Sequence, residues 1–433
     1  MDKTIFQKRR KELMQMMENG VAVIPSACEH PRNGDVHYRF RPDSDFYYLS
    51  GFPEPDAVAV LIPGRAQGEF ILFCREKDAQ RELWDGRRAG LEGAVAEYGA
   101  DDAFPIDDID DILPGLLEER DRVYCTMGRY PDFDGHLIRW LNEVRTKSRA
   151  GVHAPAGLVD IGHILHEMRL VKHNGEIRAM RRAAQVSAKA HRRAMRACRP
   201  GRYEYQLEAE LEYEFRLGGS HYPAYPSIVA GGVNACILHY TENTDKLGDG
   251  DLVLIDAGAE IDFYAADITR TFPVNGKFSG PQRDLYDVVL AAQHAAIDAC
   301  VVGNTWNDPH LAAVRVLSEG LIDLGLLDGN LDDVVENGDY RKFYMHRTGH
   351  WLGMDVHDVG DYKIADQWRP LESGMALTVE PGLYVAPVED VDSRFHGIGI
   401  RIEDDVLITP KGPEILTAGA PKDVDEIEAL MAS

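Results

Sequence analysis

The sequence predicts an α+β protein with a duplicated C-terminal part, preceded by a smaller α/β domain. Along residues 20–125 short apolar runs alternate with acidic, helix-compatible stretches, which is the pattern of an α/β domain. Further along the chain, two successive blocks each place two helices before a set of strands, over about 174–274 and 281–409. We therefore expect an accessory domain over 1–170 and a second domain over 171–433.

The N-terminal domain is expected to begin with an amphipathic helix. It would bury Phe6, Leu13 and Met17 and keep the basic cluster Lys8–Lys11 in water. Apolar runs then predict strands at VAVIP (21–25), DFYYLSGF (45–52), AVAVLIP (57–63) and FILFC (70–74). Helices are expected over about 87–98 and 106–119, and a boundary loop rich in Gly, Ala and Pro over 150–163.

The second domain is expected to open with a helix over 174–198, with Asn174 as its N-cap and Pro200-Gly201 as its end. A helix over about 205–217 then precedes strands in PSIVAGG, ACILHY, LVLIDAGAE and YAADITRTFPV, within 226–274. Helices return near 281–301 and 308–324, and strands return at MALTVEPGLYV (375–385) and GIGIRIEDDVLIT (397–409).

The composition and net charge of the chain disfavour some classes of binding partner. The 433 residues carry 47 basic and 72 acidic side chains, a formal charge of −25, with 44% hydrophobic residues as in globular proteins. Such a chain is expected to repel nucleic acid and anionic membranes and to suit cations and cationic peptide ends. No apolar run reaches the ~20 residues of a membrane helix, and the N-terminus lacks the apolar core of a secretory signal. Six scattered cysteines without a C-x-x-C pair favour reduced thiols in a cytoplasm.

Four carboxylates fall inside segments that read as buried strands: Asp256, Asp267, Glu380 and Glu403. Any one alone is most simply a turn, a helix cap or a structural salt bridge. Four together make an uncompensated cluster implausible, because like charges repel in a low-dielectric interior. Asp256 and Asp267 also flank a tight connection near Asp262-Phe263, so a hairpin can bring them onto one face to share a divalent cation.

The segment HRTGHWLGMDVHDVG (346–360) adds His346, His350 and His357 among glycines. There is no H-E-x-x-H, which excludes the helix-borne zinc peptidase arrangement. One imidazole with four carboxylates makes an oxygen-rich site that favours manganese, cobalt or iron(II), and four anionic groups balance two divalent ions. No nucleotide-binding glycine motif and no G-x-S-x-G occur, so nucleotide binding and side-chain nucleophiles have no support.

At these residues the chain resembles the pita-bread metallopeptidases, specifically the aminopeptidase P (Xaa-Pro aminopeptidase) family. The resemblance rests on ILHYTEN, LIDAGAE, ADITRTFPV, GHWLGMDVHDVG, TVEPGLY and IRIEDDVLIT, in order across about 170–410. Residues 32–63 look like the family's creatinase-like accessory domain. The resemblance implies a dimetal hydrolase that releases the N-terminal residue from Xaa-Pro peptides, through attack by a metal-bridging hydroxide on the scissile carbonyl.

The resemblance also implies roles for single residues. Two divalent ions, Mn²⁺ first with Co²⁺ or Zn²⁺ as alternatives, would be held by Asp256, Asp267, His350, Glu380 and Glu403, with Asp267 and Glu403 bridging. Glu380 would also shuttle the proton. His357 would stabilise the oxyanion, His239 and His346 would bind substrate, and Arg401 would orient a bridging carboxylate. The family forms oligomers, so a homodimer or homotetramer is expected, with Asp35 and Trp84 in segments that resemble pocket-capping regions.

Two alternatives and one departure stay open. A prolidase would use the same metals and histidines but cut only dipeptides, and a catalytically dead relative would serve as a binding scaffold. The departure is Arg347, which stands where the family usually has glycine in H-G-x-x-H. A long cation in place of glycine is expected to change substrate preference at the pocket edge rather than abolish activity.

Overall fold

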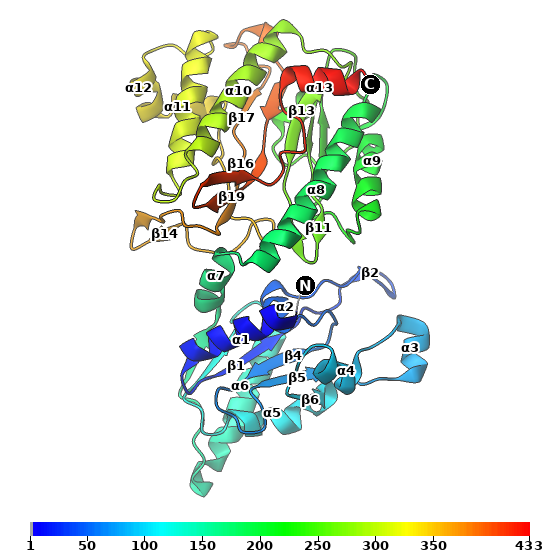
Figure 1. Cartoon of the computed structure of the whole chain (residues 1–433), viewed down its shortest axis with the longest axis vertical. Helices are drawn as coiled ribbons and strands as arrows, with labels where there is room; N and C mark the ends of the chain where they lie inside the picture. Colours follow the sequence, from blue (N-terminus) through cyan, green and yellow to red (C-terminus); the bar gives the residue numbers. More distant parts are fainter. Residues whose placement is uncertain (1–2) are drawn as a thin grey trace. The chain divides into compact units, whose positions relative to one another are not determined.

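The computed structural model describes residues 3–433 and divides the chain into two compact units, Met1–Met168 and Arg169–Ser433. Figure 1 shows both units with their helices and strands. Within the described residues no helix combines the length and the apolar character needed to span a lipid bilayer. Each unit has its own hydrophobic core, and each is described separately below.

The N-terminal unit is built on a mixed six-stranded sheet in the order β6-β5-β4-β1-β7-β8. Its strands are β1 (Val21–Pro25), β4 (Val58–Leu61), β5 (Phe70–Cys74), β6 (Asp102–Pro105), β7 (Arg122–Cys125) and β8 (Gly157–Asp160), with a small hairpin of β2 (Pro31–Asn33) and β3 (Val36–His37). Its helices are α1 (Lys3–Met17), α2 (Ser44–Ser50), α3 (Ala79–Asp85), α4 (Gly90–Ala96), α5 (Ile109–Leu117), α6 (Pro131–Thr146) and α7 (Gly162–Leu170), the last of which contains the sequence boundary between the two units. The expected α/β character is confirmed.

Three sequence predictions for this unit are wrong. DFYYLSGF forms helix α2, because Asp43 caps its first turn by accepting the Phe46 N–H at 3.0 Å and Gly51 ends it with φ +66°. The whole helix is buried, so its run of apolar residues carried no helical period. The boundary loop over 150–163 contains strand β8.

The third wrong prediction concerns the basic cluster Lys8–Lys11. Helix α1 buries Phe6, Leu13 and Met17 as expected, but it also buries Arg9 and Arg10. Arg9 donates to the Tyr48 carbonyl at 3.0 Å and Arg10 to the Leu49 carbonyl at 2.9 Å. These carbonyls belong to the last turn of α2, where they lack helical partners, so the guanidinium groups satisfy them.

The C-terminal unit repeats a pair of helices followed by strands, as expected. Figure 1 shows the pair α8 (Asn174–Ala197) and α9 (Glu204–Leu217), and the pair α10 (Gly280–Asp298) and α11 (Asp308–Asp323), flanking the strands. The first block carries β9 (Ile228–Gly231), β10 (Leu252–Asp256), β11 (Glu260–Ile261), β12 (Tyr264–Ala265) and β13 (Thr269–Pro273). The second carries α12 (Leu331–Asn337), β14 (Lys363–Ile364), β15 (Gln367–Trp368), β16 (Ala376–Val379), β17 (Gly382–Val385), β18 (Ile398–Arg401), β19 (Asp404–Thr409), β20 (Gly412–Ile415) and α13 (Val424–Met431).

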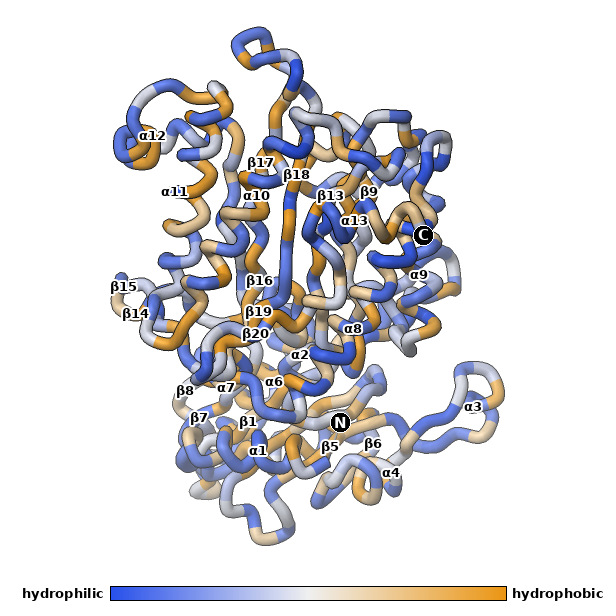
Figure 2. Tube along the Cα trace, turned by 45° about the horizontal axis from the view of Figure 1, so that its top comes forward, coloured by the Kyte–Doolittle hydropathy of each residue, from blue (hydrophilic) through white to orange (hydrophobic). Residues whose placement is uncertain are grey.

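Two details of this unit differ from expectation. ACILHY is not a strand: a 3-10 turn over Gly232–Cys236 leads into irregular backbone. Helix α8 is capped by His173 rather than Asn174, in a reciprocal arrangement with Glu176. In Figure 2 a hydrophilic stretch runs between β18 and β19 in the middle of an otherwise apolar set of strands. In the sequence, Arg401 ends β18 and Glu403 lies between β18 and β19.

Candidate metal centre

A hairpin in the first block places two of the predicted carboxylates. Strands β10 and β13 pair antiparallel with Asp256 opposite Thr269, and Asp267 lies just before β13. Asp262 and Phe263 form the tight turn of the inner β11–β12 hairpin, both with positive φ. The Tyr225 hydroxyl bonds to both carboxylates, at 2.6 Å from Asp256 Oδ1 and in a short contact with Asp267 Oδ1. The predicted hairpin is confirmed.

Two strand breaks in the second block place the other two carboxylates. Val379 pairs with Asp404 and Gly382 pairs with Arg401, so the strands around Glu380 and Glu403 are interrupted at the same level. An interruption of this kind re-aims side chains that regular alternation would send elsewhere. Glu380 and Glu403 thus both reach the cavity described below.

His350 comes from a third segment, which runs beside β16. The Thr378 N–H donates to the His350 carbonyl at 2.9 Å, and the Glu380 N–H donates to the Thr348 carbonyl at 2.8 Å. Gly349 permits this approach, because a Cβ there would lie 2.0 Å from the Thr378 carbonyl oxygen. The His350 Nδ1–H donates to the Trp351 carbonyl at 2.9 Å, so Nε2 points at the carboxylates.

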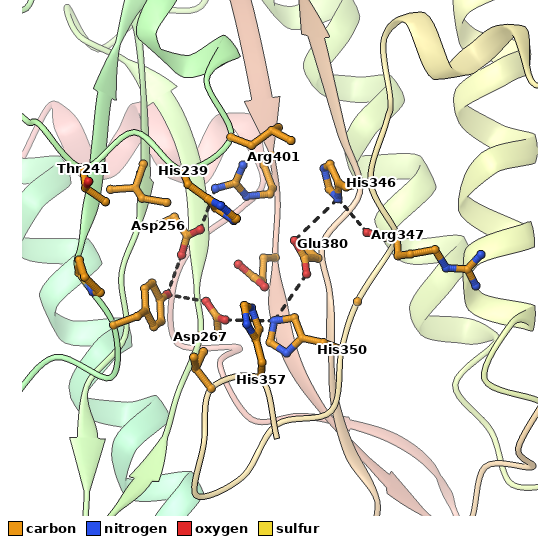
Figure 3. Close-up of a pocket in the computed structure, with 17 residues that line it drawn as sticks. His239, Thr241, Asp256, Asp267, His346, Arg347, His350, His357, Glu380 and Arg401 are labelled. Atoms are coloured by element: carbon orange, nitrogen blue, oxygen red, sulfur yellow. Dashed lines mark hydrogen bonds and ion pairs between the residues drawn. The ribbon is translucent and has the colours of Figure 1, made fainter. Parts of the chain in front are cut away.

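The donor atoms of these segments converge. One ligand atom each from Asp267, His350 and Glu403 lie within 4.8 Å of one another. His350 Nε2 is 3.4 Å from Asp267 Oδ2 and 3.6 Å from Glu380 Oε1. Figure 3 shows Asp256, Asp267, His350 and Glu380 pointing toward one another. Side chains far apart in the sequence therefore form one oxygen-rich cluster with a single imidazole.

The protein balances the charges of this cluster only in part: Arg401 pairs with Asp256 and His350 lies beside Asp267. Burial and the charge of Asp267 raise the pKa of Asp256 to about 6, and burial with the neighbouring carboxylates raises the pKa of Glu380 to about 7. Burial and the same carboxylates raise the pKa of Glu403 far above its ordinary value. A divalent cation among these carboxylates would stabilise their ionised forms and offset the repulsion that raises their pKa values. The donor set and its electrostatics therefore fit a metal centre.

The predicted histidines and Arg401 share this place. A cavity of about 470 Å³ is lined by all nine predicted site residues, namely His239, Asp256, Asp267, His346, His350, His357, Glu380, Arg401 and Glu403. The His357 ring packs edge-on against His350 with centroids 4.4 Å apart. Its loop is anchored by buried Asp358, which accepts from Arg169 Nη2 at 2.6 Å and Lys172 Nζ at 3.0 Å.

The partners of His346 define its protonation state. Its Nδ1–H donates to the Arg347 carbonyl at 2.7 Å, so Nε2 accepts from the Tyr384 hydroxyl at 2.9 Å. Burial, with the charge of Arg401, lowers the pKa of His346 to about 4. His346 is therefore a neutral side chain held in one orientation near neutral pH.

Arg401 differs from expectation in its direct partner. Its guanidinium donates to Asp256 Oδ2 at 2.7 Å, whereas Asp267 and Glu403 were the carboxylates assigned as bridging. Its hydrogen-bonded link to Glu403 runs through Thr269, which accepts from Arg401 Nε at 3.0 Å and donates to Glu403 at 2.6 Å. Thr269 and Tyr225 were both missed, because a strand threonine and a loop tyrosine have no charge or spacing that singles them out.

Comparisons with known proteins agree with this geometry. Residues 178–410 match a model described as metallopeptidase family M24, and residues 6–124 match one described as the aminopeptidase P N-terminal domain. The Xaa-Pro aminopeptidase of Escherichia coli K12 is 46% identical over 99% of this chain and 97% of its own length. Xaa-Pro aminopeptidase 3 of Rattus norvegicus is 36% identical over 98% of this chain and 85% of its own length. The solved structure of Pseudomonas aeruginosa aminopeptidase PepP is 59% identical, with a TM-score of 0.99 over 100% of this chain and 98% of that one.

Proposed function

The chain belongs to metallopeptidase family M24 and carries an aminopeptidase P N-terminal domain, and on this basis we propose that it removes the N-terminal residue from peptides with proline second. One observation of the structure carries the proposal: donor atoms of Asp267, His350 and Glu403 meet within 4.8 Å on the wall of a histidine-lined cavity. A Xaa-Pro bond lacks an N–H and has a fixed φ, so it needs a dedicated site. The family's named relatives disfavour the dipeptide-only prolidase alternative.

We propose that Asp256, Asp267, His350, Glu380 and Glu403 hold two divalent ions, with Mn²⁺ preferred and Co²⁺ or Zn²⁺ as substitutes. One solved E. coli aminopeptidase P is described as zinc-substituted, which supports a site open to more than one metal. When bound, such ions lower the pKa of water and polarise a carbonyl oxygen.

The chain's own residues supply the remaining steps. Glu380, which lines the cavity, takes a proton from water and passes it to the proline nitrogen. His357 donates to the oxygen that becomes negative during attack, and His239 contacts the proline side of the substrate. Neutral His346, fixed by Tyr384, presents a defined edge to the substrate. Arg401 holds Asp256 in place.

Cleavage of Ala-Pro-Ala and Ala-Pro by the full chain tests the proposal, after chelation and after Mn²⁺ is restored. We expect Ala-Pro-Ala to be cut only in the presence of the metal. Cleavage of Ala-Pro alone would restore the prolidase alternative. Less than about one bound metal per chain after reconstitution would restore the scaffold alternative.

We also propose that the protein works in the cytoplasm as a homodimer or homotetramer. Its six cysteines are free, which suits a reducing compartment. Leu83 and Trp84 on α3 are 84% and 87% exposed, and apolar side chains this exposed suit contact with a second copy. Asp35, in the exposed segment between β2 and β3, joins Trp84 in the proposed capping of a neighbouring active site. Light scattering of the wild type and of Trp84→Ala tests the assembly, which Trp84→Ala should weaken.

A further inference from the structure

Arg347 connects the metal-site cavity to a second one. Arg347 and Gly349 line the metal-site cavity and also an open cavity of about 620 Å³. The remaining lining residues of this second cavity are Trp306, Asp361, Tyr362, Lys363 and Trp368. No role in the metal chemistry uses these residues.

Two cations share one aromatic ring in this second cavity. The Arg347 guanidinium lies 5.0 Å from the centroid of the Trp368 ring, and Lys363 Nζ lies 4.5 Å from it. Arg347 Nη2 also donates to Asn307 Oδ1 at 2.6 Å, which fixes the guanidinium. The cation–π contacts with Trp368 therefore hold both positive charges at the wall of the cavity.

A strained hairpin holds two of these residues together. Lys363 of β14 pairs with Trp368 of β15, and the two residues between the strands, Ala365 and Asp366, have φ of +46° and +64°. A two-residue hairpin turn requires this left-handed backbone at both central positions, which residues other than glycine adopt rarely, and for alanine no side-chain hydrogen bond offsets the strain. The strain fits a hairpin kept for the position of its side chains.

Both cations lack a carboxylate partner. Across residues 3–433 neither Arg347 nor Lys363 has an acidic oxygen within 4.0 Å, although the chain has 72 acidic residues. The one acidic residue that lines the cavity is Asp361, whose carbonyl accepts from Arg369 Nε. Two cations against one carboxylate leave the cavity positive, in contrast to a chain with a formal charge of −25.

The position of this positive cavity matches one end of the substrate. The cationic α-amine of a peptide is drawn to the carboxylate cluster, so the residues after proline must extend away from it. In Figure 3 the Arg347 side chain points away from the cluster, beyond His346 and on the side opposite Asp256. The leaving peptide thus has a path along Arg347 into the second cavity.

We propose that Arg347, Lys363 and Trp368 form a subsite that binds a carboxylate of the leaving peptide, beyond its proline. This deepens the proposed function and rests on it. The carboxylate has two possible sources, an acidic side chain after proline or the free C-terminus of a short peptide. Substrates that are negatively charged there are preferred, chiefly through a lower KM.

Two matched substrate pairs separate these sources on the Mn²⁺-loaded full chain. Ala-Pro-Glu-amide against Ala-Pro-Gln-amide tests the side chain, and Ala-Pro-Ala against its amide tests the C-terminus. We expect a 3- to 10-fold higher kcat/KM for the charged member of at least one pair, the size of about 1 kcal/mol from a partly exposed ion pair. The pair that responds identifies the source, and the preference should fall with added salt.

Variants tie the preference to the residues. Arg347→Gly, which restores the glycine usual in the family, and Lys363→Gln should each reduce the preference toward 1 while the neutral amides are still cleaved. Lys363 does not line the metal-site cavity, so its variant tests the subsite even if Arg347→Gly disturbs His346. Arg315→Gln, at an exposed arginine paired with Asp332, is the control and keeps the preference. The subsite is overturned if neither substrate pair shows a preference for the charged member, or if the preference survives in both variants. If none of the four peptides is cleaved, the proposed function itself is contradicted.

Discussion

Glu403 and Asp404 are neighbours in the chain and equally inaccessible, at 2% and 0% exposure, yet their surroundings are opposite. Asp404 accepts from Arg270 Nη2 at 2.7 Å and Lys422 Nζ at 2.8 Å, and these charges outweigh burial and lower its pKa far below the ordinary value. Glu403 is surrounded by other carboxylates, and burial with their charges raises its pKa. The protein pairs Asp404 directly with two cations, whereas it places Glu403 among carboxylates, which is the arrangement that the proposed metal site requires. Burial alone therefore does not distinguish a structural carboxylate from a candidate metal ligand. The charged groups around each carboxylate must be considered as well.

Replacing a carboxylate on the metal side should give the largest effect. We expect Glu380→Ala to lower kcat/KM for Ala-Pro-Ala by about 10²–10⁴-fold, because a ligand and a proton acceptor disappear together. Steady-state kinetics at saturating Mn²⁺ measures this. Glu389→Ala, at an exposed glutamate after β17, is the control and should keep full activity. Activity above a tenth of the wild type would remove Glu380 from the mechanism.

Replacing a carboxylate on the structural side should act on stability instead. Asp404→Ala leaves Arg270 buried without its partner, which costs about 3–5 kcal/mol of unfolding free energy. Urea unfolding measures the loss, and elemental analysis should find unchanged metal per folded chain. Asp425→Ala, at an 89% exposed residue paired loosely with Arg283, should change stability by less than about 1 kcal/mol. Loss of metal at full stability in Asp404→Ala would break the distinction between the two carboxylates.

The two kinds of carboxylate should also make the stability of the folded protein change with pH in opposite directions. In the metal-free protein, folded pKa values of about 6 for Asp256 and about 7 for Glu380 exceed the unfolded values of 3.8 and 4.5. The folded state then holds protons that the unfolded state has released, so stability is lost as the pH rises through 6–7. Asp404, with a lowered pKa, contributes above its unfolded value and loses that contribution only in acid.

Melting temperatures of the chelated and Mn²⁺-loaded protein from pH 5.5 to 8 measure this difference. The chelated protein should melt lower as the pH rises, and Mn²⁺ at a hundred times its Kd should add about 2.7 kcal/mol. Chelated Glu380→Gln is the control and should show a shallower slope. Buried neutral histidines such as His346, whose pKa is lowered to about 4, add stability as the pH rises in both proteins, so the comparison with the variant is what decides. Equal slopes in chelated wild type and chelated Glu380→Gln would contradict the assignment.

The smallest expected effect concerns Tyr225, which hydrogen-bonds two carboxylates of the candidate metal centre. Tyr225→Phe removes the hydroxyl shared by Asp256 and Asp267, and we expect about 10–100-fold weaker Mn²⁺ binding. Activity should recover at saturating metal. Titration by calorimetry measures the affinity, with Tyr205→Phe at a 48% exposed tyrosine as the control. Unchanged Mn²⁺ affinity in Tyr225→Phe would show that the hydroxyl does not contribute to metal binding.

The sequence could reveal Asp256 and Asp267 because charge inside an apolar run is conspicuous and their hairpin spacing is local. Glu403 and Asp404 stand side by side in IRIEDD, and nothing local says which one faces the metals. That choice depends on Arg270 and Lys422, more than a hundred residues apart, meeting Asp404. The resemblance to a family supplied it instead.

The errors have the same origin. Helix α2 is buried on every side, so its apolar run has no period to distinguish it from a strand. Arg9 and Arg10 looked like a solvated basic cluster, but the carbonyls at the end of α2 are their partners. Burial on every side decided the first case and long-range hydrogen bonds decided the second, and a local sequence pattern contains neither.

The partners of Asp404 also set an order in which contacts can form during synthesis. Arg270 donates to the carbonyls of Ala420 and Pro421, and Lys422 completes the ion pair with Asp404. A nascent chain that has reached Asp404 already contains Arg270 but lacks these other partners until residues 420–422 have followed. The strand next to Glu403 therefore depends on a later segment of the chain and cannot be fully secured by the residues that precede it.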